Sequence, residues 1–501
     1  MRALATIAAG WAGLGLVGAN AAPPTLDALT PSGGQRGSEG LAVTALGKSD
    51  PWPVEVWCSN PGVTFEAGEK AGIFTVKITK EAEPGPCWVR TFNQDGASEP
   101  RIFVIGDQRE MTEDASIAND GPGEATAVGD LPVVINGRLE KSQDVDAWKI
   151  SLKKGETLRA RLDGYSLRSG IDPFLHLYDP DGVRIALGND NPKNLDPRLD
   201  VTAERDGDFV VAVMAIASPP NANVTFHGAA GAAYRLELSV GNSEEAKMPE
   251  GAKRIDAANA APLSLPIEGF GVLEGESGED RVRFSATKGQ SLLVRADAVG
   301  FEFPTDPVMF VEKEDGSLIR EVDDTKSDRD AEYLFKVPAD GVYTARITDR
   351  FGRKGEGMGY GLSIAEAIPG FSATVDKSGY VGKPGESVEV KLTVVRSNGH
   401  AIPLVIEAIG LPEGVSAEPL TLDEKATSGS LTIKVSANAK PFSGGFGIRA
   451  TEKTEGEKPS KSESARFSFQ GSDARGPYLL DEIADLWLTI PTKSGDNDKK
   501  S

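Results

Sequence analysis

The stretch Asp206-Gly207-Asp208-Phe209-Val210-Val211-Ala212-Val213 decides the fold, because it joins a turn signal to a strand signal. Asp-Gly pairs tolerate the backbone conformations that tight turns need. The apolar side chains that follow, from Phe209 to Val213, show the period of two that is typical of a strand with one buried face. The stretch therefore predicts a turn that leads directly into a half-buried strand.

The same stretch recurs 134 positions later, as Asp340-Gly341-Val342-Tyr343. Further pairs share this offset: Asp146 and Asp280, Gly155 and Gly289, Asp163 and Asp297, Asp172-Pro173 and Asp306-Pro307, and Asp181-Gly182 and Asp315-Gly316. Single matches of Asp and Gly occur by chance, but a register that holds from position 146 to position 207 does not. The chain therefore contains a predicted duplicated module.

The sequence of each copy predicts a series of short strands joined by turns. Hairpin signals lie at Asp181-Gly182 and Asp315-Gly316, where tight turns between strands are expected. The strand expected at 234–240 is matched by 360–364 at an offset of 126, so the first copy has an eight-residue insertion, which we place in the loop 218–232. Short strands at this spacing are typical of a β-sandwich or jelly roll.

The predicted fold class is all-β, with tandem β-sandwich or jelly-roll modules and immunoglobulin-like domains at both ends. The expected organisation is a signal peptide (1–21), an immunoglobulin-like domain (22–106), a linker (107–130), jelly roll 1 (131–242), a linker (243–261), jelly roll 2 (262–367), a second immunoglobulin-like domain (368–493) and a disordered tail (494–501). The last strand is expected at 486–490, with an amphipathic helix over 478–488 as the alternative.

The N-terminus predicts export. Arg2 precedes the apolar run 4–17, and Ala19-Asn20-Ala21 offers small residues where a signal peptidase cuts. The alternative is a membrane anchor, but the run is shorter than the roughly 20 residues that span a bilayer. No later stretch is long and apolar enough to span. The mature chain is therefore expected at the cell surface, in the periplasm or outside the cell, with no membrane span.

The two cysteines, Cys58 and Cys87, both lie in strand-like segments of the first domain. In an oxidising compartment such a pair is expected to form a disulfide. The bond would close a loop of about 30 residues and contribute roughly 3 kcal/mol on the chain-entropy estimate. Two independent buried thiols are the alternative.

Composition and motifs argue against several classes of function. The chain has 501 residues, with 54 Lys and Arg against 75 Asp and Glu and a net charge of −21, so a nucleic-acid partner is not expected. Its three histidines and two cysteines leave few candidates for metal-hydrolase or thiol chemistry. The sequence has no His-Glu-x-x-His motif, P-loop or nucleophile elbow. We therefore predict a protein that is not an enzyme, with no catalytic residues.

The duplicated module also resembles a known family. Asp144-Val145-Asp146-Ala147-Trp148, the turn at 181–182, Asn189-Asp190 and Asp206–Phe209 resemble the bacterial pre-peptidase C-terminal domain, although the second copy departs from the opening motif at 279–282. The resemblance implies jelly-roll modules that accompany secreted peptidases, with relatives in collagenases that bind collagen and calcium. The segment 31–37 makes the first domain similar to the IPT/TIG type of immunoglobulin-like domain.

Calcium is the one cofactor that the sequence suggests, because calcium takes six to eight oxygen ligands and the loop 189–196 is rich in them. The candidate ligands are Asp144, Asp146, Asp172, Asn189, Asp190 and Asp196, and the second copy offers Asp323, Asp324, Asp328 and Asp330. A linear calcium-loop signature with alternating acids and a central Gly is absent from the sequence. Solvated, turn-forming acids are therefore the alternative interpretation.

The predicted function is adhesion, scaffolding or ligand binding by a secreted or cell-envelope protein, with an extracellular protein or polysaccharide as partner. The alternatives are an array of carbohydrate- or matrix-binding modules and an accessory subunit of a secreted peptidase. Trp52, Trp57 and Trp88 would form either a sugar-stacking platform or packing around the disulfide. An exposed row of aromatic side chains would distinguish a binding module from a spacer. The sequence does not indicate an oligomeric state.

Overall fold

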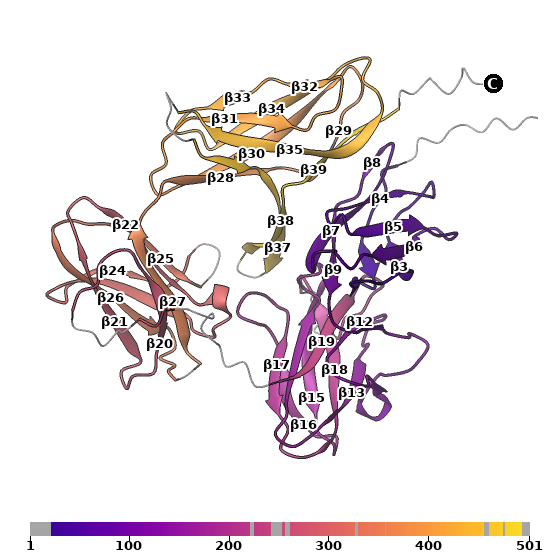
Figure 1. Cartoon of the computed structure of the whole chain (residues 1–501), viewed down its shortest axis with the longest axis horizontal. Helices are drawn as coiled ribbons and strands as arrows, with labels where there is room; N and C mark the ends of the chain where they lie inside the picture. The colour runs from indigo at the N-terminus through magenta and orange to yellow at the C-terminus, as the bar shows by residue number, and fades with distance from the viewer. Residues whose placement is uncertain are drawn as a thin grey trace, which may run out of the picture.

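The computed structural model describes residues 22–220, 225–241, 253–255, 261–325, 329–355, 357–454, 460–473 and 476–492. The predicted signal peptide and C-terminal tail lie outside these residues, as does most of the second predicted linker. Four successive pairs of β-sheets make up the described chain, which confirms the predicted fold class (Figure 1). Among the described residues, helical structure is confined to two 3₁₀ turns, η1 (Pro122–Glu124) and η2 (Val299–Phe301).

Unit 1 packs a four-stranded sheet against a second sheet built around the long strand β7. The first sheet has the order β1 (Ala28–Thr30), β3 (Leu41–Leu46), β6 (Ile73–Ile78), β5 (Val63–Ala67). The second has the order β2 (Gly33–Gln35), β9 (Arg101–Gly106), β7 (Gly85–Asn93), β4 (Glu55–Cys58), and β8 (Gly96–Ala97) pairs with β7. Phe74, Val76 and Ile78 alternate with more exposed residues along β6, as a strand with one buried face requires.

Unit 2 packs two five-stranded sheets on each other. One has the order β10 (Glu110–Thr112), β12 (Val133–Arg138), β19 (Ala233–Gly241), β14 (Thr157–Asp163), β17 (Arg198–Thr202). The other has the order β11 (Thr126–Ala127), β13 (Asp146–Leu152), β18 (Gly207–Ala217), β15 (Ile171–Tyr178), β16 (Arg184–Gly188). The segment predicted as a linker thus supplies β10 and β11, which extend both sheets by parallel pairing.

Unit 3 repeats unit 2 without these two added strands. Its sheets have the orders β20 (Ile267–Val272), β27 (Gly359–Glu366), β22 (Ser291–Asp297), β25 (Ala331–Lys336) and β21 (Glu279–Ala286), β26 (Gly341–Asp349), β23 (Pro307–Lys313), β24 (Leu318–Val322). Ile150 pairs with Phe209 in unit 2, and Phe284 pairs with Tyr343 in unit 3. Both partners move by 134 positions, so the duplicated module that the sequence predicts is present in the structure.

Unit 4 closes the described chain with two six-stranded sheets. One has the order β32 (Val415–Ala417), β34 (Ser428–Val435), β30 (Ser387–Ser397), β28 (Gly370–Val375), β37 (Arg466–Asp473), β38 (Gly476–Ile483). The other contains β29 (Gly379–Val381), β39 (Leu486–Ile490), β35 (Phe442–Glu452), β31 (Leu404–Ile409) and β33 (Leu420–Leu422), with β36 (Ser462–Ser464) on β35. The helical alternative for 478–488 is wrong, because β38 and β39 occupy this segment.

The four units form a ring, and the β37–β38 hairpin extends from unit 4 toward β7 and β9 of unit 1 (Figure 1). Ring contacts join units 1 and 4: Trp57 with Trp487, and Trp88 with Phe469. Where the structure is described, no helix is both long and apolar enough to cross a bilayer.

Candidate ligand-binding surface

The two cysteines lie next to each other in unit 1, on β4 and β7. Their Sγ atoms are 3.6 Å apart and are not bonded to each other in this structure. Cys87 is buried, and its Sγ donates a hydrogen bond to the carbonyl of Phe103 (3.1 Å). The hydrogen bond with Cys87 lowers the pKa of Cys58. The strands thus bring together the two thiols that the sequence pairs, and the disulfide itself stays a prediction.

The structure separates the six calcium candidates into two groups. Asp144 and Asp146 lie at the start of β13, where the Asp144 carboxylate accepts a hydrogen bond from the Glu140 backbone. Burial, and then the nearby Glu113 carboxyl, raise the pKa of Asp146 to about 9. One oxygen of Asp146 is buried without a hydrogen-bond partner. Two facing acids in such a site favour a shared proton, so the arrangement suits a neutral Asp146 better than a cation ligand.

The second group surrounds the loop after β16. Asp196 is buried and accepts hydrogen bonds from the backbone of Gly164 (2.7 Å), Tyr165 (2.7 Å) and Ser166 (3.0 Å). Burial, followed by Asp190 and Asp196, raises the pKa of Asp172 to about 6. Asn189 and Asp190 are exposed. Asp196 therefore fastens one loop of the fold to another, and its oxygens are already engaged.

Unit 3 carries equivalents of the buried acids. Asp330 accepts hydrogen bonds from the backbone of Ala298 (2.7 Å) and Val299 (3.0 Å), which repeats the bonds of Asp196 at an offset of 134. Tyr360 donates to Asp280 (2.7 Å), the equivalent of Asp146. Among the residues that the structure describes, no group of three or more His, Cys, Asp and Glu side chains is placed to hold a metal ion. Calcium binding stays a prediction.

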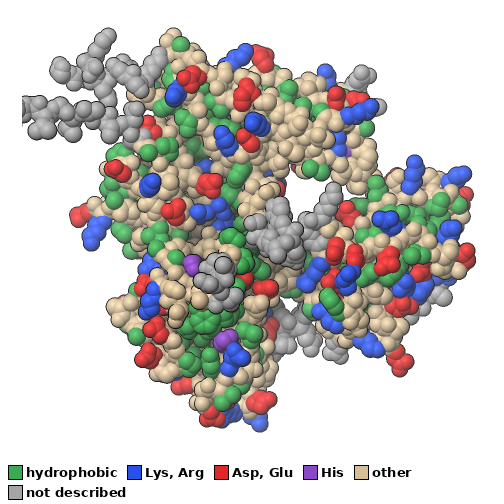
Figure 2. Space-filling model, turned by 180° about the vertical axis from the view of Figure 1, so that it is seen from behind, with side chains coloured by type: hydrophobic (Ala, Val, Ile, Leu, Met, Phe, Trp, Pro, Cys, Tyr) green, Lys and Arg blue, Asp and Glu red, His purple; other side chains and the backbone are tan. Residues whose placement is uncertain are grey.

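The outer face of the β18–β15–β16 sheet in unit 2 is apolar. Three ring side chains, Phe174, His176 and Tyr178, project from alternate positions of β15, and each is half-buried. We define the outer face of unit 2 by these three residues together with Ile216 of β18, Ile185 and Leu187 of β16, and Phe226. Val210, Ala212 and Met214 of β18 lie on the same side of the sheet and are buried. Figure 2 shows hydrophobic side chains gathered here, between the two histidines of the unit.

The rings on this face touch along a line. Phe174 and His176 have centroids 5.7 Å apart, His176 and Tyr178 lie 6.1 Å apart, and Phe226 packs edge-on against Phe174 at 5.7 Å. Leu187, opposite His176 in the sheet, is 56% exposed. Burial and the neighbouring Arg184 lower the pKa of His176. His176 is thus a half-buried ring that packs between Phe174 and Tyr178.

The equivalent face of unit 3 is built from charged side chains. Phe310 of β23 stands where unit 2 has His176, and the Arg346 guanidinium lies 3.6 Å from its ring centroid. Glu312, the equivalent of Tyr178, binds Arg346 (2.8 Å) and also Arg281. Ion pairs therefore cover the second copy, whereas the first copy presents open apolar rings.

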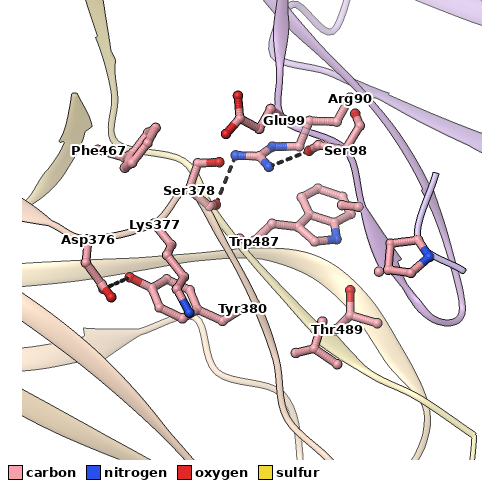
Figure 3. Close-up of a pocket in the computed structure, with 15 residues that line it drawn as sticks. Arg90, Ser98, Glu99, Asp376, Lys377, Ser378, Tyr380, Phe467, Trp487 and Thr489 are labelled. Atoms are coloured by element: carbon pink, nitrogen blue, oxygen red, sulfur yellow. Dashed lines mark hydrogen bonds between the residues drawn. The ribbon is translucent and has the colours of Figure 1, made fainter. Parts of the chain in front are cut away.

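A cavity lies where unit 4 meets unit 1 (Figure 3). The cavity, of about 260 Å³, opens between β8 and β29, lined by Arg90, Ser98, Tyr380 and Trp487, among others. Arg90 is 1% exposed and donates to the carbonyls of Ser98 (3.0 Å) and Ser378 (3.0 Å). Burial lowers its pKa to about 10. Arg90 thus holds the two units together through backbone oxygens.

Aromatic side chains complete this contact between units 1 and 4. Trp88 stacks on Phe469 with centroids 5.1 Å apart, and the Arg168 guanidinium of unit 2 lies 3.8 Å from the Phe469 ring. Trp57 packs against Trp487 at 5.9 Å, while Trp52 packs within unit 1 against Phe74 at 5.2 Å. Two of the three tryptophans therefore serve neither as a sugar platform nor only as packing around the cysteines, because they join two units of the ring.

Several residues of these sites carry no signal in the sequence. Glu113 lies in a segment without periodicity. Arg90 contacts Ser378, and Trp88 contacts Phe469, although the partners lie far apart in the sequence. His400 is buried and contacts Arg396 (2.7 Å) and Glu452 (3.0 Å). The outer face of unit 2 is different, because the alternation of rings along 174–178 could have revealed it.

No protein-family model and no curated protein matches the chain. Fibronectin(III)-like modules of Clostridium thermocellum CbhA are similar in structure, at 14% identity over 42% of this chain and 85% of theirs, with a TM-score of 0.15. The four N-terminal Ig domains of Dscam1 isoform 6.9 align at 10% identity over 89% of this chain and 98% of theirs (TM-score 0.20). The ICAM-5 D1–D4 fragment aligns at 14% over 87% and 97% (TM-score 0.14). At such scores these alignments say nothing about function.

Proposed function

We propose that the chain is a non-enzymatic, exported multidomain protein that binds an extracellular or cell-envelope ligand through the outer face of unit 2. The observation that carries this proposal is the half-buried aromatic row of β15, with the exposed side chains of Ile185 and Leu187 beside it. Exposed, contiguous apolar surface on a folded protein marks interaction sites. Unit 3 has the same fold with an ion-paired face, so folding does not require the apolar one.

Three finer proposals accompany this function. Units 2 and 3 belong to the pre-peptidase C-terminal family, on the strength of the motifs at 144–148 and 206–209. Cys58 and Cys87 form a disulfide after export, which the 3.6 Å separation of their sulfur atoms supports. The side of unit 2 that carries Asp172 and Asp190 is where calcium binding should be tested.

Binding arrays test the proposed function. The secreted protein is applied to arrays of glycans, collagens and other matrix proteins beside the variant Leu187→Glu, which places on unit 2 the charge that Glu321 gives unit 3. We expect specific binding that the variant loses. Panels of peptidase and glycosidase substrates run in parallel. Turnover of any substrate, or binding that Leu187→Glu leaves intact, would contradict the proposal.

A further inference from the structure

We infer that the outer face of unit 2 binds a neutral polysaccharide, with consecutive sugar units lying along β15. This inference rests on the proposed function and adds the class of ligand. It depends on the column of rings at Phe174, His176 and Tyr178 and on the groups that lie around this column.

The column offers apolar ring faces and polar atoms in alternation. The His176 Nδ1 atom lies 3.4 Å from the Tyr178 hydroxyl, and Arg184 Nη1 lies 3.4 Å from His176 Nε2. Both distances are at the long limit for a hydrogen bond, so a sugar hydroxyl that replaces either contact breaks only a weak one. A sugar ring presents a C–H face for an aromatic side chain and hydroxyls at its rim, and Tyr and His side chains have the same division.

A peptide fits this face poorly. The backbone groups of β15 are paired with β16 on one side and with β18 on the other. A peptide laid on the rings would lose the water around its own N–H and C=O groups without gaining partners, which is costly. The edge strand β16 is no better, because it has five residues and a bulge opposite Tyr178. Short, bulged edges resist the addition of a strand.

A second copy of the chain and an anionic polymer are also disfavoured. Three strands and the positions 210–216 span at most about 14 by 20 Å, or about 300 Å², and Val210, Ala212 and Met214 within this area are buried. A stable protein partner buries about 800 Å². The net charge of −21 opposes the approach of a negatively charged polymer. A narrow, uncharged polysaccharide chain fits both the small area of the face and the negative charge of the protein.

Titration calorimetry with defined hexasaccharides tests the inference on the secreted protein. The probes are the neutral β-1,4-glucan, β-1,4-xylan and β-1,3-glucan hexamers, the anionic hexagalacturonate, and a library of nine-residue peptides with alternating apolar residues. Tyr178→Glu, His176→Phe and Phe174→Val give unit 2 the residues that unit 3 tolerates at Glu312, Phe310 and Val308. Leu334→Glu, at an exposed position of β25, is the matched control.

We expect at least one neutral hexamer to bind, with affinity falling about tenfold in Tyr178→Glu and unchanged in Leu334→Glu. Tyr178→Phe, which keeps the ring, should retain most of the binding, and melting curves confirm that the variants fold. If only peptides, matrix proteins or hexagalacturonate bind at this face, or if the face mediates dimers in sedimentation, the inference is overturned while the proposed function stands. If nothing binds there, both fail.

Discussion

Units 2 and 3 share one strand arrangement and present different outer faces. Their strands follow the same order, and Asp196 and Asp330 fasten equivalent loops through equivalent backbone groups. On the outside, Tyr178 and Glu312 occupy the same position, one in an aromatic row and the other in an ion-paired network. The comparison separates residues that specify the fold from residues that are free to change. The rings on unit 2 belong to the second class, so their presence calls for a reason other than folding.

The shared core has its own signature. Tyr234 and Tyr360 are fully buried, and each lies over a glycine at the equivalent position of the neighbouring strand. A Cβ atom at Gly137 would lie 2.2 Å from Cζ of Tyr234, and one at Gly271 would lie 2.3 Å from Cζ of Tyr360. Each glycine therefore makes room for the ring, and the two positions are coupled.

The largest effect is expected from removing these rings. Tyr234→Ala and Tyr360→Ala should each cost about 3–5 kcal/mol of the free energy of unfolding of their own unit, because each leaves a large cavity. Hydrogen exchange resolved by unit measures this free energy separately for the two copies. Equal losses would confirm that the core is shared. A loss below about 1 kcal/mol in one copy would break the equivalence.

The loop carboxylates should give the next largest effect. Asp196→Ala should lower the free energy of unfolding by about 2–3 kcal/mol, because three backbone N–H groups would lose the buried carboxylate that accepts their hydrogen bonds. Asp330→Ala should cost less, since within the described loop 298–300 the backbone bonds to Asp330 come from Ala298 and Val299. Chemical denaturation followed by unit-resolved exchange ranks the two variants. The reverse ranking would argue that Asp196 serves a ligand rather than the loop.

The buried acids predict a difference in pH dependence. The pKa of Asp146 is raised to about 9 in the fold from an ordinary value of 3.8. A raised pKa means that the folded unit holds the proton more tightly, so its stabilising effect is complete below about pH 4 and is lost as the pH rises toward 9. Asp146→Asn should therefore stabilise unit 2 by about 1–2 kcal/mol at pH 8 and flatten this decline.

Unit 3 is the internal control for that experiment. Burial also raises the pKa of Asp280, and a hydrogen bond from Tyr360 lowers it, as a hydrogen bond with Tyr234 does for Asp146. In unit 3, however, Arg254 offsets the nearby Glu274, whereas Glu113 raises the pKa of Asp146 further. The stability of unit 3 is therefore expected to fall less than that of unit 2 as the pH rises, and Asp280→Asn should not stabilise unit 3. Destabilisation of unit 2 by Asp146→Asn at pH 8 would show that Asp146 is ionised in the fold.

The sequence predicted the features that units 2 and 3 share. Alternation at 209–213 and the 134-residue offset depend on local chemistry, namely turn residues and a two-residue period. The offset is present in the structure, where even the pairing of Ile150 with Phe209 is repeated. Residues 209–213 do form part of β18, but all five are buried, so the expected half-buried strand is wrong at this point. The strands β10 and β11 were missed because each has three residues or fewer and pairs with a distant strand.

The candidate sites were less accessible to sequence reasoning. The acids at Asp146 and Asp196 were noticed, but their roles depend on Glu113 and on the 164–166 backbone, which only tertiary structure brings close. Trp88 gave no sign that it would stack on Phe469, because that contact joins the first and last units of the ring. Local patterns identify which side chains are unusual, whereas their partners depend on how the units meet.

The smallest expected change in stability comes from a substitution on the outer face of unit 2. This substitution tests most directly whether units 2 and 3 differ only in that face. Leu187 is 56% exposed on unit 2, so Leu187→Glu should change the free energy of unfolding by less than about 0.5 kcal/mol, as surface substitutions usually do. The same variant should abolish array binding. A loss of more than about 1 kcal/mol, measured by denaturation, would mean that the apolar face supports the fold after all. An unchanged free energy of unfolding together with lost binding would assign the outer face of unit 2 to recognition, because the substitution would then leave the fold that units 2 and 3 share intact.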